Sequence, residues 1–442
     1  MELRGKSVVV VGLGRSGIAA AKLCLSRGAK VSGTDSRTLE EIGDSVRTLG
    51  VPLVLGGHDA APFGDADVVV VSPGVPPFSA LDKAARNGAL VIGELDLAAR
   101  FVKAPIVAVG GTNGKSTVTT ATAALVAASG KRTFSGGNLG TPLAEAVDQP
   151  FDVLVVEVSS FQLERAPAFH PKVGVLLNVT EDHLDRYPSF DAYAAAKGNA
   201  FVNQTDDDVA VVPAGDRLCR REAERGDARV LTFGEKADYV VDGASVVERA
   251  SGERFSLEGT DFHGTHNFSN AAASIAAARA IGVGAEAVRA GLREFRALGH
   301  RMALVSEVNG VRYYDDSKAT NVGAAVTALR GLVEPRAVLV AGGRDKLGSY
   351  EPLVQALVEK ARGVVVIGEA ADRIASAVSG RVPVVFAKTM EDAVRRAQEL
   401  AKPGDAVLLS PACASFDMFK GYADRGDRFV EAVKSLSPRS AS

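Results

Sequence analysis

The 442-residue chain lacks the features that mark secreted, membrane-bound and nucleic-acid-binding proteins. Its three cysteines, Cys24, Cys219 and Cys413, are too few and too far apart for a disulfide framework or a zinc site. Its 51 basic and 53 acidic residues nearly cancel, so we expect no broad positive field for nucleic acid. No apolar run approaches the ~20 residues of a membrane span, and residues 1–6 lead into a strand-like run rather than a signal peptide. We therefore expect a cytoplasmic protein without membrane insertion or a nucleic-acid partner.

What the chain does have is a short valine-rich run that ends in glycine and precedes an alanine-rich, helix-like segment. Runs without polar alternation are typical of strands buried on both faces, and the helices between them imply parallel βαβ units. The pattern therefore predicts an α/β fold with mostly parallel sheets. Clear examples of the strand-like runs are residues 7–11, 106–109, 338–340 and 364–367.

The length predicts roughly three domains at ~150 residues each. Two changes of pattern indicate where the domains meet, because a helix-like stretch ends and a new strand-like run begins around residues 100–105 and again around 297–301. The predicted domains are residues 1–100, 101–298 and 299–442.

Two segments depart from the βαβ pattern. Residues 303–314 alternate in polarity and contain Asn309-Gly310, which predicts a β-hairpin with a tight turn. Residues 220–262 look like strands and turns of lower apolar content, which predicts a β-rich insertion in the middle domain.

The first glycine-rich loop, residues 12–17, lies between a strand-like run and an amphipathic helix. Glycines allow close backbone approach, and a helix N-terminus offers free amides to a phosphate. About 20 residues further on, Asp35 follows the next strand, where an acidic side chain commonly contacts a ribose hydroxyl. Taken alone, the loop indicates a nucleotide diphosphate site, such as that of a nicotinamide dehydrogenase. The alternative is a turn that serves only strand–helix packing.

The second glycine-rich loop, residues 110–117, follows a strand-like run and opens a long helix. It resembles a P-loop, in which backbone amides hold phosphates, Lys115 reaches the β/γ region and Ser116 can ligate Mg²⁺. The spacing departs from the common form, since Val109 stands where a glycine is expected. We expect a variant phosphate-binding loop.

Two polar clusters follow the next strands of the middle domain. Glu157 ends the strand 153–156, where a carboxylate beside a P-loop can bind Mg²⁺, although a solvated acid is the alternative. His183 lies in the cluster 178–185 after the strand 173–177. Imidazole is not a favoured Mg²⁺ ligand, so weak metal contact, substrate binding and a structural role all remain open for this residue.

Later motifs carry weaker signals on physical grounds. Lys197 passes for a surface lysine, residues 264–271 for a capped helix start, and the glycine loop 342–346 for a solvated turn. Residues 315–321 and 410–417 are rich in polar side chains and follow strand-like runs, which is common for loops that carry function.

Five of these motifs occur in an order that resembles the Mur ligases of peptidoglycan synthesis. The resemblance extends from residue 6 to about residue 429, and it implies a Rossmann-like N-terminal domain, a central P-loop ATPase-type domain and a Rossmann-like C-terminal domain. The first glycine loop and the 410–417 motif favour the branch that adds D-glutamate, and the Asp-Asn-Pro-Arg motif of the diamino-acid-adding branch is absent. The five motifs are Gly-Gly-Thr-Asn-Gly-Lys-Ser-Thr (110–117), Asn-Val-Thr-Glu-Asp-His-Leu-Asp-Arg (178–186), His-Asn-Phe-Ser-Asn (266–270), Asp-Ser-Lys-Ala-Thr-Asn (316–321) and Ser-Pro-Ala-Cys-Ala-Ser-Phe-Asp (410–417).

The resemblance also implies roles for single residues, and it assigns the first loop to a UDP-linked substrate rather than to NAD. The implied UDP-substrate contacts are Gly14, Arg15, Ser16, Asp35, Arg37, Ser72, Gly74, Asn138 and His183. The implied ATP contacts are Gly111, Thr112, Asn113, Gly114, Lys115, Ser116, Thr117, Asn267, Asn270, Arg301, Asp316 and Lys318. The implied D-glutamate contacts are Thr320, Lys346, Ser415, Phe416 and Tyr422. The implied metal ligands are Ser116, Glu157, His183 and Lys197, the last as a carbamate, and the implied catalytic residues are Lys115, His183 and Lys197.

The activity implied is ATP-dependent amide formation between UDP-N-acetylmuramoyl-L-alanine and D-glutamate, with Mg²⁺ or alternatively Mn²⁺ as the metal, by a monomeric enzyme. Two departures from the family pattern are small: Gly299 replaces a proline or charged residue, and Tyr422 stands at a position of variable aromatic character.

A nicotinamide-dependent oxidoreductase and a non-catalytic nucleotide switch are the rival interpretations. The first leaves the second loop and Glu157 unexplained, and the converging charged residues argue against the second.

Overall fold

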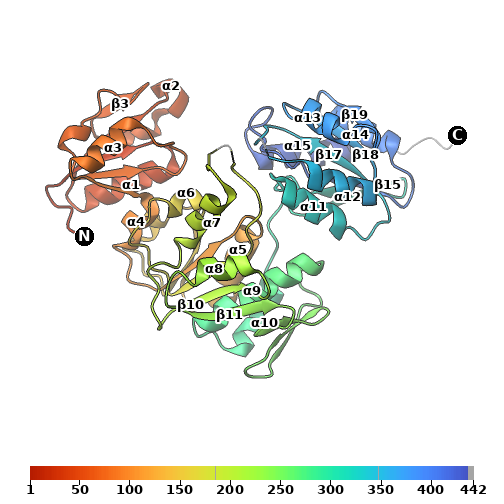
Figure 1. Cartoon of the computed structure of the whole chain (residues 1–442), viewed down its shortest axis with the longest axis horizontal. Coiled ribbons are helices and arrows are strands. Elements are labelled where there is room, and N and C mark those ends of the chain that lie inside the picture. The colour runs from red at the N-terminus through yellow and green to blue at the C-terminus, as the bar shows by residue number, and fades with distance from the viewer. Residues whose placement is uncertain (185, 347, 437–442) are drawn as a thin grey trace. The chain divides into compact units, whose positions relative to one another are not determined.

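The computed structural model describes residues 1–184, 186–346 and 348–436, so Asp185 of the 178–186 motif lies outside the described residues (Figure 1). It contains three separate β-sheets with helices between their strands, which confirms the predicted α/β class. The chain forms two compact units. The first unit is Met1–Val179, Asp191–Phe262 and Phe268–Arg296, and the second is Thr180–Phe190, His263–Asn267 and Ala297–Ser442.

The N-terminal sheet is fully parallel, in the order β3-β2-β1-β4-β5. Its valine runs are buried because helices cover both faces of such a sheet. The order reverses between β1 and β4, and ligands of open α/β sheets bind outside the carboxyl ends of strands at such a point. Its elements are β1 (Ser7–Val11), α1 (Arg15–Ser26), β2 (Lys30–Asp35), α2 (Leu39–Ile42), β3 (Leu53–Leu55), β4 (Val68–Val71), α3 (Ser79–Arg86), β5 (Leu90–Gly93) and α4 (Glu94–Ala99).

The central sheet has the order β14-β13-β12-β11-β10-β9-β6-β8-β7. Strand β6 lies between β8 and β9, so the loops that follow these three strands share one sheet edge. The strands are β6 (Ile106–Gly110), β7 (Thr133–Gly137), β8 (Val153–Glu157), β9 (Val173–Leu176), β10 (Val209–Pro213), β11 (Arg229–Gly234), β12 (Tyr239–Val241), β13 (Ser245–Glu248) and β14 (Arg254–Ser256). The helices are α5 (Lys115–Ala127), η3 (Leu143–Ala146), α6 (Ser160–Leu163), α7 (Phe190–Gly198), α8 (Arg217–Ala223), α9 (Thr265–Ala280) and α10 (Ala285–Glu294).

The predicted β-rich insertion is partly wrong. Residues 220–223 end helix α8, and β11 to β14 extend the central sheet instead of standing apart from it. Strand β11 pairs parallel with β10, and only β12–β13 and β13–β14 pair antiparallel. The lower apolar content follows from their place at the end of the sheet, where β13 and the edge strand β14 are short and only partly buried.

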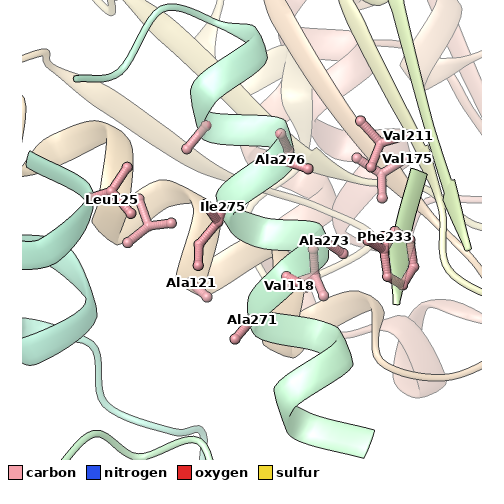
Figure 2. Close-up of a cluster of buried hydrophobic side chains, with 14 of the residues drawn as sticks. Val118, Ala121, Leu125, Val175, Val211, Phe233, Ala271, Ala273, Ile275 and Ala276 are labelled. Atoms are coloured by element: carbon pink, nitrogen blue, oxygen red, sulfur yellow. The ribbon is translucent and has the colours of Figure 1, made fainter. Parts of the chain in front are cut away.

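Helix α9 explains how the central core packs so closely (Figure 2). Its residues 271–278 are fully buried, and six of these eight are alanine. Small side chains allow α9 to contact Val118 and Leu125 of α5 on one side and Phe233 of β11 on another. A helix that is apolar on all sides is typical of a core element. Its first turn, by contrast, carries the polar residues of the 266–270 motif.

The C-terminal sheet has the order β15-β16-β20-β17-β18-β19. The predicted hairpin is confirmed, since β15 and β16 are antiparallel and both turn residues, Asn309 and Gly310, have positive φ. The elements are β15 (Ala303–Val308), β16 (Val311–Asp315), α11 (Val322–Gly331), β17 (Ala337–Gly342), α12 (Glu351–Lys360), β18 (Ala361–Ile367), α13 (Ala371–Val378), β19 (Val384–Phe386), α14 (Met390–Leu400), β20 (Ala406–Leu409) and α15 (Tyr422–Lys434). In the part of the chain that the structure describes, no helix has the length and apolar character to cross a membrane.

Candidate functional site

The first glycine loop forms a tight turn between β1 and α1. A Cβ on Gly12 would lie 2.8 Å from Val75, and a Cβ on Gly17 would overlap the carbonyl oxygen of Gly12. These two glycines are therefore required for the packing of strand against helix, which was the alternative explanation of this loop. Gly14 differs, because a Cβ there would meet open space at the N-terminus of α1. The turn thus brings the helix N-terminus to a position that a ligand can approach.

Asp35 is buried at the end of β2 and already has partners. Its carboxylate accepts hydrogen bonds from the backbone N–H of Leu13 at 2.7 Å and from Nε and Nη2 of Arg37 at 3.1 and 2.9 Å. Burial opposes ionisation of Asp35, but the hydrogen bonds from Arg37 and Leu13 outweigh it and hold the pKa below its ordinary value. Asp35 therefore acts first as a fixed anion that orients Arg37.

A cavity of about 680 Å³ lies beside this loop within the first unit. Eight of the nine residues predicted for the UDP substrate line it, namely Gly14, Arg15, Ser16, Asp35, Arg37, Ser72, Gly74 and Asn138, whereas the ninth, His183, belongs to the second unit. No sequence pattern indicated two further lining residues, His58 and Phe78, whose rings stack with centroids 4.9 Å apart. The cavity thus combines a helix N-terminus, a guanidinium and a flat ring surface, which suits a nucleotide diphosphate.

The second glycine loop joins β6 to α5 and needs its glycines for conformation. Gly111 and Gly114 have φ of 144° and 85°, and a Cβ on Gly114 would lie 2.7 Å from Oδ1 of Asn270. Asn178 fixes the loop, because its Oδ1 accepts from the N–H of Asn113 at 2.9 Å and its Nδ2 donates to the carbonyl of Asn113 at 3.1 Å. Asn178 lies in the 178–186 motif, but nothing in the sequence indicates this role for it.

Lys115 begins α5 and folds back over its own loop. Its Nζ donates to the carbonyl oxygens of Gly111 at 2.9 Å and Thr112 at 2.8 Å. This places the ammonium group above the backbone amides that would hold a phosphate. Ser116, in the same turn, is buried.

Lys197 is not the surface lysine that its sequence context suggests on physical grounds. It is only 3% exposed, its Nζ donates to the carbonyl of Gly111 at 2.9 Å, and it lies 4.5 Å from the ring centroid of Tyr193. The Tyr193 hydroxyl in turn lies 3.1 Å from Oγ1 of Thr112. Helix α7 thus presents Lys197 to the phosphate loop.

Glu157, at the end of β8, is a buried carboxylate whose two oxygens differ in their hydrogen bonding. Its Oε1 accepts from Nδ2 of Asn138 at 2.7 Å, whereas Oε2 has no hydrogen-bond partner among the described residues. A buried carboxylate oxygen without a partner is unfavourable unless a cation or water satisfies it. Together with the Ser116 hydroxyl, this oxygen fits the oxygen-donor chemistry of Mg²⁺.

The four predicted metal ligands do not all lie in one unit. Glu157 and Lys197 belong to the first unit, and His183 belongs to the second. His183 has a positive φ of 55°, and its Nε2 lies 3.6 Å from Oδ2 of Asp182. No cluster of three or more His, Cys, Asp or Glu side chains suited to a metal occurs in the described part of the chain. A metal role for His183 stays a prediction.

The predicted ATP contacts outside the phosphate loop are also divided between the units. Asn270 lies in the first, whereas Asn267, Arg301, Asp316 and Lys318 lie in the second. Asp316 is buried and accepts from the Ser410 hydroxyl at 2.9 Å; burial raises its pKa to about 7, against the opposing effects of Ser410 and Arg301. Lys318 places its Nζ 3.9 Å from the ring centroid of Tyr422.

Four of the five predicted D-glutamate contacts lie on three loops of the second unit, and the fifth, Tyr422, begins α15. Thr320 follows β16, Lys346 follows β17, and Ser415 and Phe416 follow β20. The last two loops are joined where the N–H of Arg344 donates to the carbonyl of Ala414 at 2.8 Å. Phe416 is 68% exposed, and Lys346 donates to Oδ1 of Asp182 at 3.0 Å beside a cavity of about 250 Å³.

Arg425 of α15 was missed because a charged residue on an amphipathic helix looks exposed in the sequence. It is fully buried and donates to the carbonyls of Ser317 at 2.8 Å and Cys413 at 3.1 Å. Burial lowers the pKa of Arg425 to about 10. Its guanidinium therefore connects the loop after β16 with the loop after β20.

Comparison with known proteins agrees with this division into three sheets. Residues 6–93 match the N-terminal domain model described as Mur ligase MurD-like, residues 109–278 match the Mur ligase middle domain, and residues 300–413 match the Mur ligase glutamate ligase domain. The chain belongs to the Mur ligase family. The three matches fall within the three predicted domains, whose boundaries stay predictions.

Curated relatives match the chain over almost its full length. The UDP-N-acetylmuramoylalanine--D-glutamate ligases of Desulfosudis oleivorans and Geotalea daltonii are 46% and 45% identical to it, over 99% of this chain and 98% and 99% of theirs. Among solved structures, the fold is similar to that of the UDP-N-acetylmuramate-alanine ligase MurC of Thermotoga maritima, with a TM-score of 0.62, 22% identity, and coverage of 97% and 99% of the two chains. It is also similar to the MurF ligase of Thermotoga maritima in complex with ADP, with a TM-score of 0.60, 21% identity, and coverage of 98% and 95%.

Proposed function

We propose that this Mur ligase joins D-glutamate to UDP-N-acetylmuramoyl-L-alanine and converts ATP to ADP and phosphate. The observation that carries the proposal is that relatives of this name are 43–46% identical to the chain over nearly its whole length. The cavity in the first unit supports it, because eight of the nine residues expected for a UDP-linked substrate line one space.

The UDP end of the substrate is bound at the first glycine loop. The diphosphate lies near the N-terminus of α1 and the Arg37 guanidinium, because both carry positive charge. The His58–Phe78 pair offers a flat surface for the uracil ring. Asn138, at the same cavity and hydrogen-bonded to Glu157, directs the muramoyl end toward the phosphate loop.

ATP is bound at the second glycine loop, with Lys115 beside its β/γ-phosphates. Ser116 and Glu157 hold Mg²⁺, with Mn²⁺ as an alternative, and His183 and a carbamate on Lys197 complete the predicted ligand set. When bound, the metal neutralises phosphate charge. A carbamate requires an unprotonated Lys197 amine and CO₂, and it converts a buried cation into an anion with two oxygen donors. Asn267, Asn270, Arg301, Asp316 and Lys318 contact the rest of the nucleotide.

The reaction needs an activated acyl group, because a carboxylate is a poor electrophile. The substrate carboxylate attacks the γ-phosphate of ATP to give an acyl phosphate, and the amine of D-glutamate then attacks the acyl carbon. The tetrahedral intermediate expels phosphate and leaves an amide. Lys115 contributes mainly by positioning and by offsetting the charge that gathers between two anionic reactants.

D-glutamate brings two carboxylates, which need cationic or hydroxyl partners. Lys346, Thr320 and Ser415 supply these groups, and Phe416 and Tyr422 bound the site with apolar surface. Because Lys346 donates to Asp182 in this structure, the incoming carboxylate has to compete with Asp182 for the N–H groups of that ammonium.

We also infer that the enzyme works as a monomer in the cytoplasm, where ATP is available. All three cysteines are buried and unpaired, which agrees with a reducing compartment.

The proposal is tested by measuring phosphate release from ATP with the complete set of substrates and with each substrate omitted in turn. We expect release to require ATP, a divalent metal, D-glutamate and UDP-N-acetylmuramoyl-L-alanine together. Release that persists without D-glutamate, or that prefers another amino acid in its place, would contradict the proposed acceptor. Reduction of NAD by the protein would support the oxidoreductase alternative.

A further inference from the structure

A buried tyrosine joins two of the loops that carry the proposed D-glutamate contacts. Tyr350, which precedes α12, is 6% exposed and lies between the loop after β17 and the loop after β20. Its hydroxyl donates to Oδ1 of Asp345 at 3.1 Å and lies 3.2 Å from Sγ of Cys413. Asp345 is the chain neighbour of Lys346, and Cys413 lies two residues before Ser415. One hydroxyl therefore contacts both loops.

The direction of these hydrogen bonds follows from proton counting. An ionised carboxylate only accepts, so the single hydroxyl proton of Tyr350 goes to Asp345, and the thiol of Cys413 must donate to the Tyr350 oxygen. Burial raises the pKa values of both groups, that of Cys413 to about 11, so both keep their protons at neutral pH. The result is a directed chain from the Cys413 thiol through the Tyr350 hydroxyl to the Asp345 carboxylate.

Arg373 of α13 closes this network from the other side. Its Nη1 pairs with Oδ2 of Asp345, its Nη2 donates to the carbonyl of Gly348 at 2.8 Å, and its guanidinium carbon lies 5.3 Å from the Tyr350 ring centroid. Both oxygens of Asp345 are thereby fixed. The loop after β17 is held by charge on one side and by the tyrosine hydroxyl on the other. Besides the backbone hydrogen bonds from Gly342 to Pro411 and from Arg344 to Ala414, the Tyr350 hydroxyl adds a side-chain contact to the loop after β20.

We propose that Tyr350 is a positioning residue that holds the Lys346 loop and the Ser415 loop at the spacing required to bind the acceptor amino acid. This inference rests on the proposed function, which assigns Lys346 and Ser415 to D-glutamate. Tyr350 does not touch the acceptor itself. Its loss acts through the relative position of two binding groups, so it weakens acceptor binding more than it affects ATP or the UDP-linked substrate.

The test compares Tyr350→Phe, which removes only the hydroxyl, with Tyr239→Phe. Tyr239 is also buried and also donates to a carboxylate, Glu248, at 2.7 Å, but it lies on β12 of the first unit. For Tyr350→Phe we expect the KM for D-glutamate to rise roughly three- to tenfold, the range that corresponds to the net worth of one typical hydrogen bond. The KM values for ATP and for the UDP-linked substrate, and kcat, should change by less than about twofold. Tyr239→Phe should leave all four constants unchanged even if it lowers the melting temperature equally.

A second measurement does not depend on the identity of the acceptor. Hydrogen–deuterium exchange in the full chain should show faster amide exchange in residues 342–346 and 410–417 of Tyr350→Phe together, and in neither segment of Tyr239→Phe. Unchanged exchange would overturn the coupling of the loops. Faster exchange with an unchanged KM for D-glutamate would overturn the positioning role. A wild-type protein that releases no phosphate in response to D-glutamate would refute the proposed function, whereas the exchange experiment would still decide the coupling.

A double-variant cycle with Cys413→Ala tests the path of the coupling. If Tyr350 acts on the Ser415 loop through the thiol, the double variant should raise the KM for D-glutamate no more than Tyr350→Phe alone, because both changes break the same contact. If the double variant instead raises the KM for D-glutamate by the product of the two single-variant effects, the proposed link through Cys413 is overturned.

Discussion

At the scale of single residues, the contacts of a side chain indicate a functional role that its neighbours in the sequence do not. Lys115 and Lys197 both donate to the carbonyl of Gly111, so two cations meet at the phosphate loop. Two ammonium groups that close together repel each other, and the repulsion is relieved when a phosphate binds or when one amine becomes a carbamate. The phosphate loop is therefore arranged for an anionic ligand.

Lys115→Ala should lower ligase activity by orders of magnitude and leave the fold intact. The variant removes the charge that offsets the transferring phosphoryl group and two hydrogen bonds to loop carbonyls, whereas the two hydrogen bonds between Asn178 and Asn113 remain and hold the loop backbone. Initial rates and a thermal melt measure the two effects. Lys131→Ala is the control and should be fully active, because Lys131 lies in the same domain and donates to the carbonyl of Ile281 at 3.3 Å instead of to the phosphate loop. Near-normal turnover of Lys115→Ala would remove the P-loop assignment.

Lys197→Ala should be nearly inactive, and small carboxylic acids at high concentration should partly restore its turnover. Removing the side chain leaves a space beside the phosphate loop, and a free carboxylate can enter it and replace the oxygens of a carbamate. The measurement is the rate with and without added acetate or formate, with chloride as the control anion. Wild-type rates in the variant would contradict a catalytic role. An inactive variant that no carboxylate restores would argue against the carbamate alone.

The sequence could not predict the environment of Lys197 by physical reasoning. A lysine among alanines on a helix looks solvated, and its burial depends on which face of α7 meets the phosphate loop, where Lys197 contacts Gly111 and Tyr193 contacts Thr112. The same limit applies to Arg425, His58 and Phe78, whose partners are distant in the chain. The glycines and the strand-end residue Glu157 were predictable, because local conformation and sheet topology suffice to place them.

At the scale of elements, valine-rich runs predicted the strands well because parallel strands are buried on both faces. The hairpin at 303–314 followed from its turn residues. The strands β12 to β14 were harder, since they are short and only partly buried, and the sequence does not reveal that they extend the central sheet. Contacts between elements, such as that between α4 and η3, lie beyond local patterns altogether.

Glu94 links α4 to η3 and should make stability depend on pH. Its Oε1 accepts from the N–H of Ala144 at 2.6 Å, and its Oε2 has no partner among the described residues. Burial raises the pKa of Glu94 to about 7, despite that hydrogen bond and with a small contribution from Glu145. A raised carboxyl pKa means that the folded state binds the proton more tightly. Its stabilising effect is therefore complete below the unfolded pKa and is lost as pH rises toward 7.

Glu94→Gln should raise the melting temperature above pH 7 and have little effect near pH 5. The amide keeps the acceptor for Ala144 and stays neutral, and its NH₂ occupies the place of the carboxyl OH. The gain above pH 7 has an upper limit of about 3 kcal/mol, since each pKa unit is worth ~1.4 kcal/mol. Melting curves from pH 5 to 8 provide the measurement, with the exposed Glu145→Gln as the control. An equal shift at both ends of this range would contradict the assignment.

At the scale of the whole molecule, each of the three sheets carries a glycine-rich loop at the carboxyl end of one of its strands. The loops follow β1, β6 and β17, and each is accompanied by charged or polar groups from neighbouring strand ends. Their ligands differ: a UDP-linked substrate at the first, ATP at the second and an amino acid at the third. The predicted ATP contacts come from both compact units, so catalysis in the proposed function requires the complete chain.

Measurements of ligand binding at the first loop are enough to distinguish the proposed ligase from a nicotinamide enzyme. A ligand that binds only the folded state stabilises it by RT ln(1 + [L]/Kd), which is about 2.7 kcal/mol at a hundredfold excess over Kd. We expect UDP-N-acetylmuramoyl-L-alanine, and UDP-sugars more weakly, to raise the melting temperature of the protein, whereas NAD should not.

Arg37→Ala tests that this stabilisation arises at the cavity beside the first loop. The variant removes the guanidinium that Asp35 orients there, so the UDP-dependent shift should shrink while the shift produced by ATP with Mg²⁺ stays as in the wild type. Because the two ligands are predicted to use different loops of the first unit, the ATP shift serves as an internal control for folding. A saturable NAD shift, or a UDP shift that survives in Arg37→Ala, would mean that the ligand of this cavity is not the diphosphate of a UDP-linked substrate.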